Sequence, residues 1–552
     1  MEEGSRHGGS LRKGNALSLS EERTDRRSHD RAPLETPMNR YGWKGRRLKV
    51  HLDGGKSEIS PIDSETLEAF IGGRGLNSIL LYREIQPGTD PLGNKNILCL
   101  AVGPLNGTLA PTSGKMTISA KSPLTGIHGD ANTGGFFCSE MKFAGYDQIA
   151  VYGKASQPTY LWIKDDRIEM RDASRLWGKD TWETDRLIKE ELGDPNVQIV
   201  SIGQAGENQV KFAGVISNLT RIAGRTGMGT VMGSKRLKAI AIRGSGNVEV
   251  ASPVQFKQAC LKTHSKIKAT GVYQLLHNFG TPFLLDHTNE VGRLSTRNCQ
   301  QGWFEGVEKV GVEVLRKNYL GKNRGCASCP VLCGHTYSVP VGELMNRGDS
   351  AEYENIASFS AMVGNDDVEV ALYASTMCDR YGLDTISTGY AIAFAMELWE
   401  KGFISENDTN GLQLGWGNRQ AILSLLDQIA HRSSTFGDLL AEGVQSVSRK
   451  FPGSERFAMV IKGNPCNVGD YRATKGGAFA QAVATRGADH LRGSPVIEYM
   501  GVSPDESEKI FGHILGREKA RSLVDYRAYF GKPSAEIIHA HNTENKDPQK
   551  IN

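Results

Sequence analysis

Short apolar runs separated by glycine, proline and aspartate dominate the first half of the chain. Residues 46–52 (RRLKVHL) alternate between polar and apolar side chains, residues 53–55 (DGG) are typical of a hairpin turn, and residues 57–62 (SEISPI) match a returning strand. Similar apolar runs follow at NILCLAV, QIAVYG, YLWIKDD, VQIVSIG and KAIAIRG. This pattern predicts a β-rich region with short helices.

The pattern becomes helical after Ser252-Pro253. Asp366 and Asp367 can cap a helix that we expect to end at Gly382, because glycine readily adopts the left-handed conformation found at helix ends. Asp384 can cap the helix that follows. Helical stretches are expected at residues 385–401 and 419–432.

A chain of 552 residues is too long for a single hydrophobic core. With 39% hydrophobic and 23% charged residues, it has the composition of an ordinary globular protein. The formal net charge of +4 gives no reason to expect nucleic acid or an anionic membrane as a partner. We expect an α+β protein with four segments: a disordered extension at 1–37, a β-rich domain at 38–248, and two mainly α-helical domains at 249–455 and 456–552.

No apolar run approaches the roughly 18 residues that a membrane-spanning helix needs. Residues 1–37 are rich in charged residues, serine and glycine, and they lack the apolar core of a signal peptide. Their few large apolar side chains cannot offset the entropy of ordering, so we expect disorder there and a natural start at Met38. The expected location is cytoplasmic.

Three of the nine cysteines, Cys326, Cys329 and Cys333, lie within eight residues. Their C-x2-C-x3-C spacing lets a short loop present soft thiolates to three corners of a [4Fe–4S] cube. Zinc stays open as an alternative, with His335 as a sterically cramped fourth ligand, and so do unligated core thiols. A cube needs a fourth ligand, for which Cys466 is a candidate by elimination alone.

An ordered series of further motifs surrounds these cysteines. In chain order they are Tyr41-Gly-Trp-Lys-Gly, Ile71-Gly-Gly-Arg-Gly-Leu, Gly103-Pro-Leu-Asn-Gly-Thr, Lys121-Ser-Pro-Leu-Thr-Gly, Asn132-Thr-Gly-Gly, Lys142-Phe-Ala-Gly-Tyr-Asp, Ala223-Gly-Arg-Thr-Gly-Met-Gly, Asp379-Arg-Tyr-Gly-Leu-Asp and Thr485-Arg-Gly-Ala-Asp-His. Together with the cysteines, the series resembles the aldehyde ferredoxin oxidoreductase family over nearly all of residues 38–538. The resemblance implies a β-rich saddle domain and two helical domains that enclose a tungsten bis-pyranopterin (tungstopterin), a nearby [4Fe–4S] cluster and a magnesium ion bridging the pterin phosphates.

The resemblance also implies which residues contact the cofactor. These are Lys115, Asn132, Gly134, Ala223, Arg225, Asp379, Leu383, Asp384 and Arg486. The Asn132 side chain and the Ala223 carbonyl would bind magnesium, whereas Asp379 and Asp384 can accept N–H groups of a pterin. At Lys115 the family more often has arginine, so the charge is kept and the bidentate fork is lost. The simpler interpretations stay open, in which Asp384 only caps a helix, Asn132 is a turn residue and the glycines only turn strands.

By the same resemblance, Glu354 and His490 stand beside the metal. Oxidation of an aldehyde needs an oxygen donor, a place for two electrons and a proton acceptor, of which tungsten would supply the first two. We therefore assign Glu354 as general base and His490 as the hydrogen-bond donor that polarises the carbonyl group. The alternative is that Glu354 only caps or pairs at a helix start and His490 only completes a turn. Electrons would leave through the cluster to ferredoxin or a small iron–sulfur subunit.

Two features depart from the family pattern. After Ala535 the chain continues to AHNTENKDPQKIN in place of a second Asp-x-x-Gly-Leu-Cys segment, so we expect a truncated or frameshifted C-terminus. Tyr373 stands where some members have a glutamate that binds a metal between subunits, so we do not predict that metal, although a homodimer remains compatible. Two other functions stay open: the tungsten subunit of a benzoyl-CoA reductase, and an inactive remnant that carries only an iron–sulfur cluster. The sequence specifies neither the aldehyde nor tungsten over molybdenum.

Overall fold

The computed structural model describes residues 41–492, 498, 502–525 and 528–534. The chain divides into two compact units, Met1–Asn39 and Arg40–Asn552, and every described residue belongs to the second. The expected disorder of residues 1–37 and the departure from the family pattern after Ala535 lie outside the described residues.

The first sheet has the strand order β2-β1-β6-β3-β4-β5. Its strands are β1 (Arg46–His51), β2 (Lys56–Pro61), β3 (Leu98–Ala101), β4 (Met116–Lys121), β5 (His128–Thr133) and β6 (Gln148–Tyr152), and its helices are α1 (Ser64–Phe70), α2 (Gly73–Glu84) and α3 (Phe137–Phe143). The predicted hairpin is confirmed, since β1 and β2 pair antiparallel from Arg46↔Pro61 to His51↔Lys56. Buried Asn77 anchors α2 on this sheet by donating to the Cys99 and Thr117 carbonyls at 3.3 and 3.0 Å.

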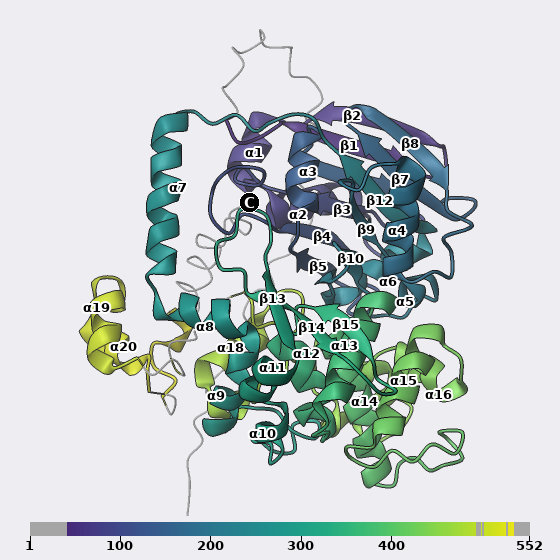
Figure 1. Cartoon of the computed structure of the whole chain (residues 1–552), viewed down its shortest axis with the longest axis vertical. Helices are drawn as coiled ribbons and strands as arrows, with labels where there is room; N and C mark the ends of the chain where they lie inside the picture. The colour runs from purple at the N-terminus through teal and green to yellow at the C-terminus, as the bar shows by residue number, and fades with distance from the viewer. Residues whose placement is uncertain (1–40, 493–497, 499–501, 526–527, 535–552) are drawn as a thin grey trace, which may run out of the picture. The chain divides into compact units, whose positions relative to one another are not determined.

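The second sheet has the strand order β11-β10-β9-β12-β7-β8. Its strands are β7 (Thr159–Lys164), β8 (Arg167–Asp172), β9 (Gln198–Ser201), β10 (Val215–Ser217), β11 (Arg221–Ala223) and β12 (Leu237–Arg243), accompanied by α4 (Thr181–Leu192), α5 (Gln204–Glu207), η1 (Arg225–Gly227) and α6 (Met228–Ser234). Buried side chains from both sheets, such as Leu48, Ile118, Val200 and Ile240, share one hydrophobic core. The β-rich N-terminal half is therefore confirmed, and Figure 1 shows its strands together in purple to blue.

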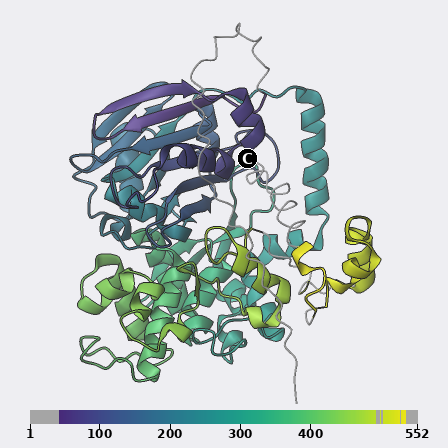
Figure 2. The ribbon, with the colours of Figure 1, turned by 180° about the vertical axis from the view of Figure 1, so that it is seen from behind.

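Helices dominate the rest of the described chain. They are α7 (Pro253–Lys268), α8 (Gly271–Phe279), η2 (Thr281–Phe283), α9 (Leu284–Glu290), α10 (Val307–Val310), α11 (Val312–Asn318), α12 (Tyr353–Phe359), η3 (Ala361–Val363), α13 (Val368–Tyr381), α14 (Thr385–Glu400), α15 (Arg419–His431), α16 (Thr435–Ala441), α17 (Val444–Ser448), η4 (Glu455–Phe457), η5 (Tyr471–Ala473), α18 (Lys475–Val483), α19 (Pro504–Leu515) and α20 (Arg517–Ser522). The Asp367 side chain caps α13, Gly382 ends it in the left-handed conformation, and Asp384 caps α14. These predicted boundaries are confirmed. Figure 2 shows the helices α12 to α17 from behind in green.

A small sheet interrupts the helical part, which the sequence analysis did not anticipate. Its strands are β13 (Leu320–Arg324), β14 (Gly334–Val339) and β15 (Asn346–Asp349), in the order β13-β14-β15, and a two-stranded ribbon follows at β16 (Val460–Ile461) and β17 (Asn464–Pro465). These strands are short and β13 is mostly exposed, so they carry little of the alternation that marks a half-buried strand. None of the described helices is both long and apolar enough to span a bilayer.

Candidate metal and active site

The three clustered cysteines lie in the loop that joins β13 to β14. The pair Arg324↔Gly334 closes this loop, which we call the cysteine loop and which comprises residues 325–333. Ser328 (φ 54°) and Leu332 (φ 52°) adopt left-handed backbone angles that bend it back on itself. The cysteine loop thus presents its three thiols from the end of a hairpin that the sequence analysis did not anticipate.

The cysteine loop is fixed against the β-rich half of the chain by its backbone. The Ala327 N–H donates to the Gly135 carbonyl at 3.1 Å, and the Thr112 N–H donates to the Ser328 carbonyl at 3.0 Å. The Ser328 hydroxyl donates to the Thr108 carbonyl at 2.7 Å. These bonds set the thiols beside the end of β5, where the cofactor contacts of that strand are expected.

Burial and neighbouring groups control the charge of the thiols. Burial raises the pKa of Cys333 to about 12, an effect that Glu352 strengthens and Arg221 opposes. Burial also raises the pKa of Cys329, whose thiol accepts hydrogen bonds from the Val331 and Leu332 N–H groups. Because a metal ligand must be the thiolate, iron binding would displace protons from these thiols. The N–H donors are of the kind that stabilise cluster sulfur.

In the described part of the chain, the cysteine loop and His335 do not form a site for a single metal ion. Among the described residues, no group of three or more histidine, cysteine, aspartate or glutamate side chains could hold one metal ion. The ring Nε2 of His335 lies 3.1 Å from the His277 carbonyl and 3.2 Å from the Asn323 amide, so this ring is engaged by the protein. Cys466 lies apart from the cysteine loop, since its thiol interacts with Cys299 and Arg225.

Gly134 directly follows β5 and lies against the cysteine loop. A Cβ atom added to Gly134 would lie 2.5 Å from the Cys326 Sγ, a distance that side-chain carbons do not reach. The glycine proposed as a cofactor contact therefore lies directly against a cluster thiol. Only a residue without a side chain allows this thiol to keep its position.

We expect the substitution Gly134→Ala to lower the iron content of the purified protein by at least half, because the new methyl group must displace Cys326. The matched control is Gly54→Ala, where an added Cβ atom meets no heavy atom within 4 Å. Iron and acid-labile sulfide would be measured per chain in both variants. Full iron content in Gly134→Ala would show that Cys326 does not bind the cluster in the position seen here.

The residues expected to bind a magnesium ion come from adjacent strands. Asn132 lies on β5, where its Oδ1 accepts a hydrogen bond from the Thr117 hydroxyl at 3.2 Å. Ala223 is buried at the end of β11. The Thr133 hydroxyl, next to Asn132, donates to the Arg221 carbonyl on β11 at 2.8 Å. The two candidate ligands thus lie on strands that are tied together.

Arg225 and Asp384 form an ion pair between the β-rich and helical halves. The Arg225 Nη1 lies 3.1 Å from the Asp384 Oδ2, and its Nη2 donates to the Pro465 carbonyl. Asp384 also accepts hydrogen bonds from the Ser387 N–H and hydroxyl as the cap of α14. Asp384 therefore does cap α14, and it also orients the guanidinium of Arg225.

Three polar side chains of the helical half, those of Asp379, Asn464 and Gln481, are buried. Asp379 is 3% exposed, and burial raises the pKa of its carboxyl group well above the ordinary value. The Asn464 Oδ1 and Gln481 Oε1 atoms are buried without a hydrogen bond. Buried polar atoms of this kind need a donor, and the N–H groups of a pterin are donors. The residues present therefore fit such a cofactor.

The other expected contacts have different surroundings. Leu383 is fully buried and donates its backbone N–H to the Cys378 carbonyl at 2.8 Å. Lys115 is exposed, and its charge acts on Cys329 of the cysteine loop. The positive charge of Lys115 thus lowers the pKa of Cys329, one of the expected cluster ligands.

Arg486 belongs to a buried network of four charges. Asp489 pairs with Arg486 at 2.7 Å and with Arg492, which also pairs with Asp130. The Arg486 Nη1 donates to the Asp130 backbone carbonyl at 2.6 Å. The two guanidinium groups hold the pKa of Asp489 well below its ordinary value against the effect of burial. This network fixes the chain at the residue that precedes His490, and sequence reasoning did not identify Arg492 or Asp130.

Glu354 and His490 are brought together in the folded chain. The His490 Nε2 lies 3.8 Å from the Glu354 Oε1. The Asn467 Nδ2 donates to Glu354 Oε1 at 2.9 Å, and the Val468 N–H donates to Glu354 Oε2 at 2.9 Å. The partners of Glu354 thus come from a loop 113 residues away in sequence, not from the start of its own helix. This excludes the interpretation of Glu354 as a helix cap.

Asn467 is a site residue that the sequence did not reveal. Its Oδ1 accepts hydrogen bonds from the Gln481 Nε2 at 2.9 Å and from the Tyr471 hydroxyl, so its amide is held from both sides. The surrounding NPCNVGD segment matches no motif. The role of Asn467 becomes apparent only in the folded chain, where this loop lies against α12. Asn467 therefore fixes the direction of the Glu354 carboxylate.

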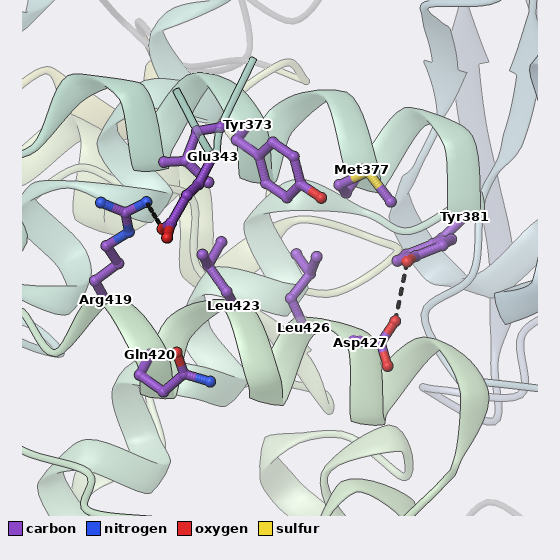
Figure 3. A pocket seen from close by; sticks show the side chains of 10 residues that line it. Glu343, Tyr373, Met377, Tyr381, Arg419, Gln420, Leu423, Leu426 and Asp427 are labelled. Atoms are coloured by element: carbon purple, nitrogen blue, oxygen red, sulfur yellow. Dashed lines mark hydrogen bonds and ion pairs between the residues drawn. The ribbon is translucent and has the colours of Figure 1, made fainter. Parts of the chain in front are cut away.

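A separate cavity of about 280 Å³ lies between α13 and α15 (Figure 3). Tyr373 and Met377 line one side, the Tyr381 hydroxyl donates to Asp427 at 2.9 Å, and Arg419 pairs with Glu343 at 3.1 Å. Each charged side chain of this group already has a partner. The cavity shares no residue with the cysteine loop or with the Glu354–His490 pair.

The fold and the site together define a class of protein, a redox enzyme whose iron–sulfur loop lies against a cofactor-binding β region beneath a helical cover. The sequence profile described as "Aldehyde ferredoxin oxidoreductase, N-terminal domain" matches residues 47–244, and the profile described as "Aldehyde ferredoxin oxidoreductase, domains 2 & 3" matches residues 258–540. The chain belongs to the aldehyde ferredoxin oxidoreductase family and is an oxidoreductase.

Individual relatives agree with this assignment. The chain is 39% identical to the tungsten-containing aldehyde ferredoxin oxidoreductase of Thermococcus kodakarensis over 489 residues, which are 88% of this chain and 79% of the relative. It is 30% identical to the WOR-like subunit of an aliphatic sulfonate oxidoreductase from Pyrococcus furiosus over 477 residues, 82% of this chain and 75% of the relative. A solved active-site complex, BamBC of benzoyl-coenzyme A reductase with 1,5-dienoyl-CoA, has a similar fold with a TM-score of 0.70 and 31% identity, covering 77% of this chain and 66% of that one.

Proposed function

We propose that this protein oxidises aldehydes to carboxylic acids at a tungsten bis-pyranopterin and passes the electrons through a [4Fe–4S] cluster to ferredoxin or a small iron–sulfur subunit. The observation that carries the proposal is the pair Glu354 and His490, whose side chains meet at 3.8 Å although they come from distant segments. A carboxylate and an imidazole in contact are the groups that proton management in this reaction requires.

Residues from both halves of the chain would hold the cofactor. Cys326, Cys329 and Cys333 would bind the cluster, while Asn132 and the Ala223 carbonyl would bind magnesium between the pterin phosphates. The residues expected to contact the pterins are Lys115, Gly134, Arg225, Asp379, Leu383, Asp384 and Arg486. When bound, tungsten supplies the Lewis acidity and the two-electron redox change.

Glu354 acts as the general base. The N–H donors of Asn467 and Val468 hold its two oxygens, so that the carboxylate faces His490 and cannot rotate away. In this position it can take a proton from the water that becomes the second oxygen of the acid. Holding the base in one orientation removes an entropic cost from the reaction.

His490 acts as a hydrogen-bond donor to the aldehyde oxygen. Burial lowers the pKa of His490, and the positive charges of Arg225 and Arg486 lower it further, whereas Glu354 and Asp489 raise it. The net direction is downward, so the ring is neutral at neutral pH and has one N–H to donate. A neutral donor can polarise a carbonyl group without adding a charge to the interior.

The activity is expected to be retained as the pH is lowered to the ordinary histidine value of about 6.5 and to fall only below it, because the pKa of His490 is depressed. The variant His490→Asn keeps an N–H donor but cannot titrate, so this acidic decline should disappear while kcat/KM falls about 10- to 100-fold. Aldehyde-dependent viologen reduction would be measured from pH 5 to 8. A decline centred above pH 6.5 in the unmodified protein would contradict a neutral His490.

The proposal is tested by elemental analysis of the purified protein combined with aldehyde-dependent reduction of benzyl viologen. Tungsten, about four iron atoms per chain and aldehyde oxidation together would support it. Iron without tungsten or molybdenum would instead support a module that carries only a cluster. Reduction of benzoyl-CoA by low-potential electrons, without aldehyde oxidation, would support the benzoyl-CoA reductase alternative.

A further inference from the structure

Helix α7 projects from the rest of the described chain. Of its sixteen residues only Cys260 is buried, and within the described residues α8 is the element it contacts appreciably. Figures 1 and 2 both show α7 as a separate helix at one side of the ribbon. Most of this sixteen-residue helix is thus exposed and not packed against other described residues, although isolated helices of this length are only marginally stable in water.

The exposed surface of α7 is positively charged. Lys257, Lys262, Lys266 and Lys268 are all exposed, and the helix contains no aspartate or glutamate. None of the four lysines forms an ion pair within the part of the chain that the structure describes. Four unneutralised positive charges on one helix create a local field that attracts an acidic surface.

A groove of about 390 Å³ joins α7 to the cysteine loop. One wall carries Lys257, Cys260, Leu261 and His264, whose spacing of three and four places them on one face of the helix. The opposite wall consists of Leu109, Cys326, Ser328, Cys329 and Pro330. Two of the three cluster cysteines therefore line the same groove as the basic helix.

An exposed leucine stands on each wall of the groove. Leu109 is 63% exposed on one side and Leu261 is 59% exposed on the other. Exposed leucines flanked by positive charges form the pattern of a protein interface, in which an apolar centre is surrounded by charged groups that steer the partner.

We propose that α7 and the cysteine loop form the docking face for an acidic electron-carrier protein. This inference rests on the proposed function, because it assigns the exit of the electrons from that same site. Each aldehyde consumes one water and yields the acid, two protons and two electrons, so two one-electron carriers must dock in turn. A small face steered by charge suits such repeated, short-lived encounters.

The position of the groove explains why this face would be selected. Electron transfer needs close approach, and a carrier seated against Leu109 and Leu261 would lie directly over Cys326 and Cys329. The lysines of α7 would meet carboxylates on the carrier outside this apolar contact. Binding there should weaken as salt is added, because the attraction is between exposed charges.

The test uses the full chain with the triple variant Lys257→Glu, Lys262→Glu and Lys266→Glu. The matched control reverses three exposed lysines elsewhere, Lys95→Glu, Lys164→Glu and Lys450→Glu. Two acceptors are compared: an acidic [4Fe–4S] ferredoxin and benzyl viologen, which is small and needs no docking face. We expect KM for ferredoxin to rise at least tenfold at low salt in the α7 variant only, with the viologen rate unchanged in both.

Other outcomes would overturn the proposal. An unchanged KM for ferredoxin in the α7 variant would show that the carrier docks elsewhere. Binding of anionic phospholipid vesicles that is lost in the α7 variant, with ferredoxin kinetics intact, would assign the face to a membrane. A dimer that dissociates in the α7 variant would assign it to a second copy of the chain.

Direct measurement of ferredoxin binding separates this proposal from the proposed function. If the unmodified protein fails to oxidise aldehydes with viologen yet binds ferredoxin through the α7 lysines, the proposed function fails and the docking face stands. If it oxidises aldehydes with viologen but the α7 variant binds ferredoxin normally, the docking face fails and the proposed function stands.

Discussion

Replacement of Glu354 by glutamine is expected to lower kcat for aldehyde oxidation by about 10²- to 10⁴-fold. Glutamine has nearly the shape of glutamate but cannot accept a proton. It also brings an N–H group to face either Asn467 Nδ2 or the Val468 N–H, so one of the two bonds to the side chain is lost. Single-turnover reduction of the cofactor by aldehyde would measure the chemical step without carrier docking.

The control for this variant is Glu343→Gln, which makes the same chemical change in a side chain that is 90% exposed and lies away from the pair. Iron and tungsten content should be unchanged in both variants, since Glu354 binds neither the cysteine loop nor the expected pterin contacts. If Glu354→Gln retained activity within threefold of the unmodified protein, its role as base would be wrong.

The substitution Asp489→Asn is expected to have the largest effect on stability. Asp489 is the shared partner of Arg486 and Arg492, whose side chains are 3% and 6% exposed. Asparagine would leave two buried guanidinium groups with only Asp130 to offset them, which costs about 3–5 kcal/mol. Because His490 follows directly, activity should also be lost at temperatures where the protein still folds.

The pH dependence gives a second measure of this network. The pKa of Asp489 in the folded protein is well below the value of about 3.9 expected when unfolded. Its stabilising contribution is therefore complete well above the unfolded pKa and is lost progressively as the pH falls from that value towards the folded pKa. Urea unfolding at pH 7 and pH 5.5 should therefore show the same difference between the unmodified protein and Asp489→Asn, and the difference should shrink below pH 4.

The matched control is Asp505→Asn, which removes an exposed carboxylate that pairs with Arg521 on the surface. Exposed ion pairs contribute little, so the unfolding midpoint should hardly move. A small effect of Asp489→Asn, similar to that of the control, would show that the buried network does not hold this segment.

Local signals in the sequence predicted the elements that depend on neighbouring residues. The Asp-Gly-Gly turn specified the hairpin of β1 and β2, and Asp367, Gly382 and Asp384 marked the boundaries of α13 and α14. The three-cysteine spacing likewise predicted a short loop that carries three thiols, because ligand spacing is a property of a short segment. Sheet order escaped prediction, since β1 pairs with β6, which is distant along the chain.

In the candidate site, too, sequence motifs pointed to some residues, whereas the roles of others depend on contacts between distant segments. The resemblance of motifs pointed to Glu354 and His490, but Asn467, which orients Glu354, lies in a segment without a recognisable pattern. Asp384 was expected to cap a helix and to contact a pterin; it caps α14, and its ion pair with Arg225 of the β-rich half was not foreseen. Gly134 was expected to contact the cofactor, and its neighbour in the structure is the Cys326 thiol.

The sequence by itself determined the residue types of this protein's chemistry: three thiols at cluster spacing, the Glu354 and His490 candidates, and the family to which the motifs point. Only the tertiary structure decided which groups share one site, which cysteine lies apart, and that the basic helix α7 faces the cysteine loop across a groove. The physical reason is the separation along the chain over which each interaction acts. Caps, turns and ligand spacing act between residues that are neighbours in the chain, whereas burial, ion pairing and proton transfer act between residues that only folding makes neighbours.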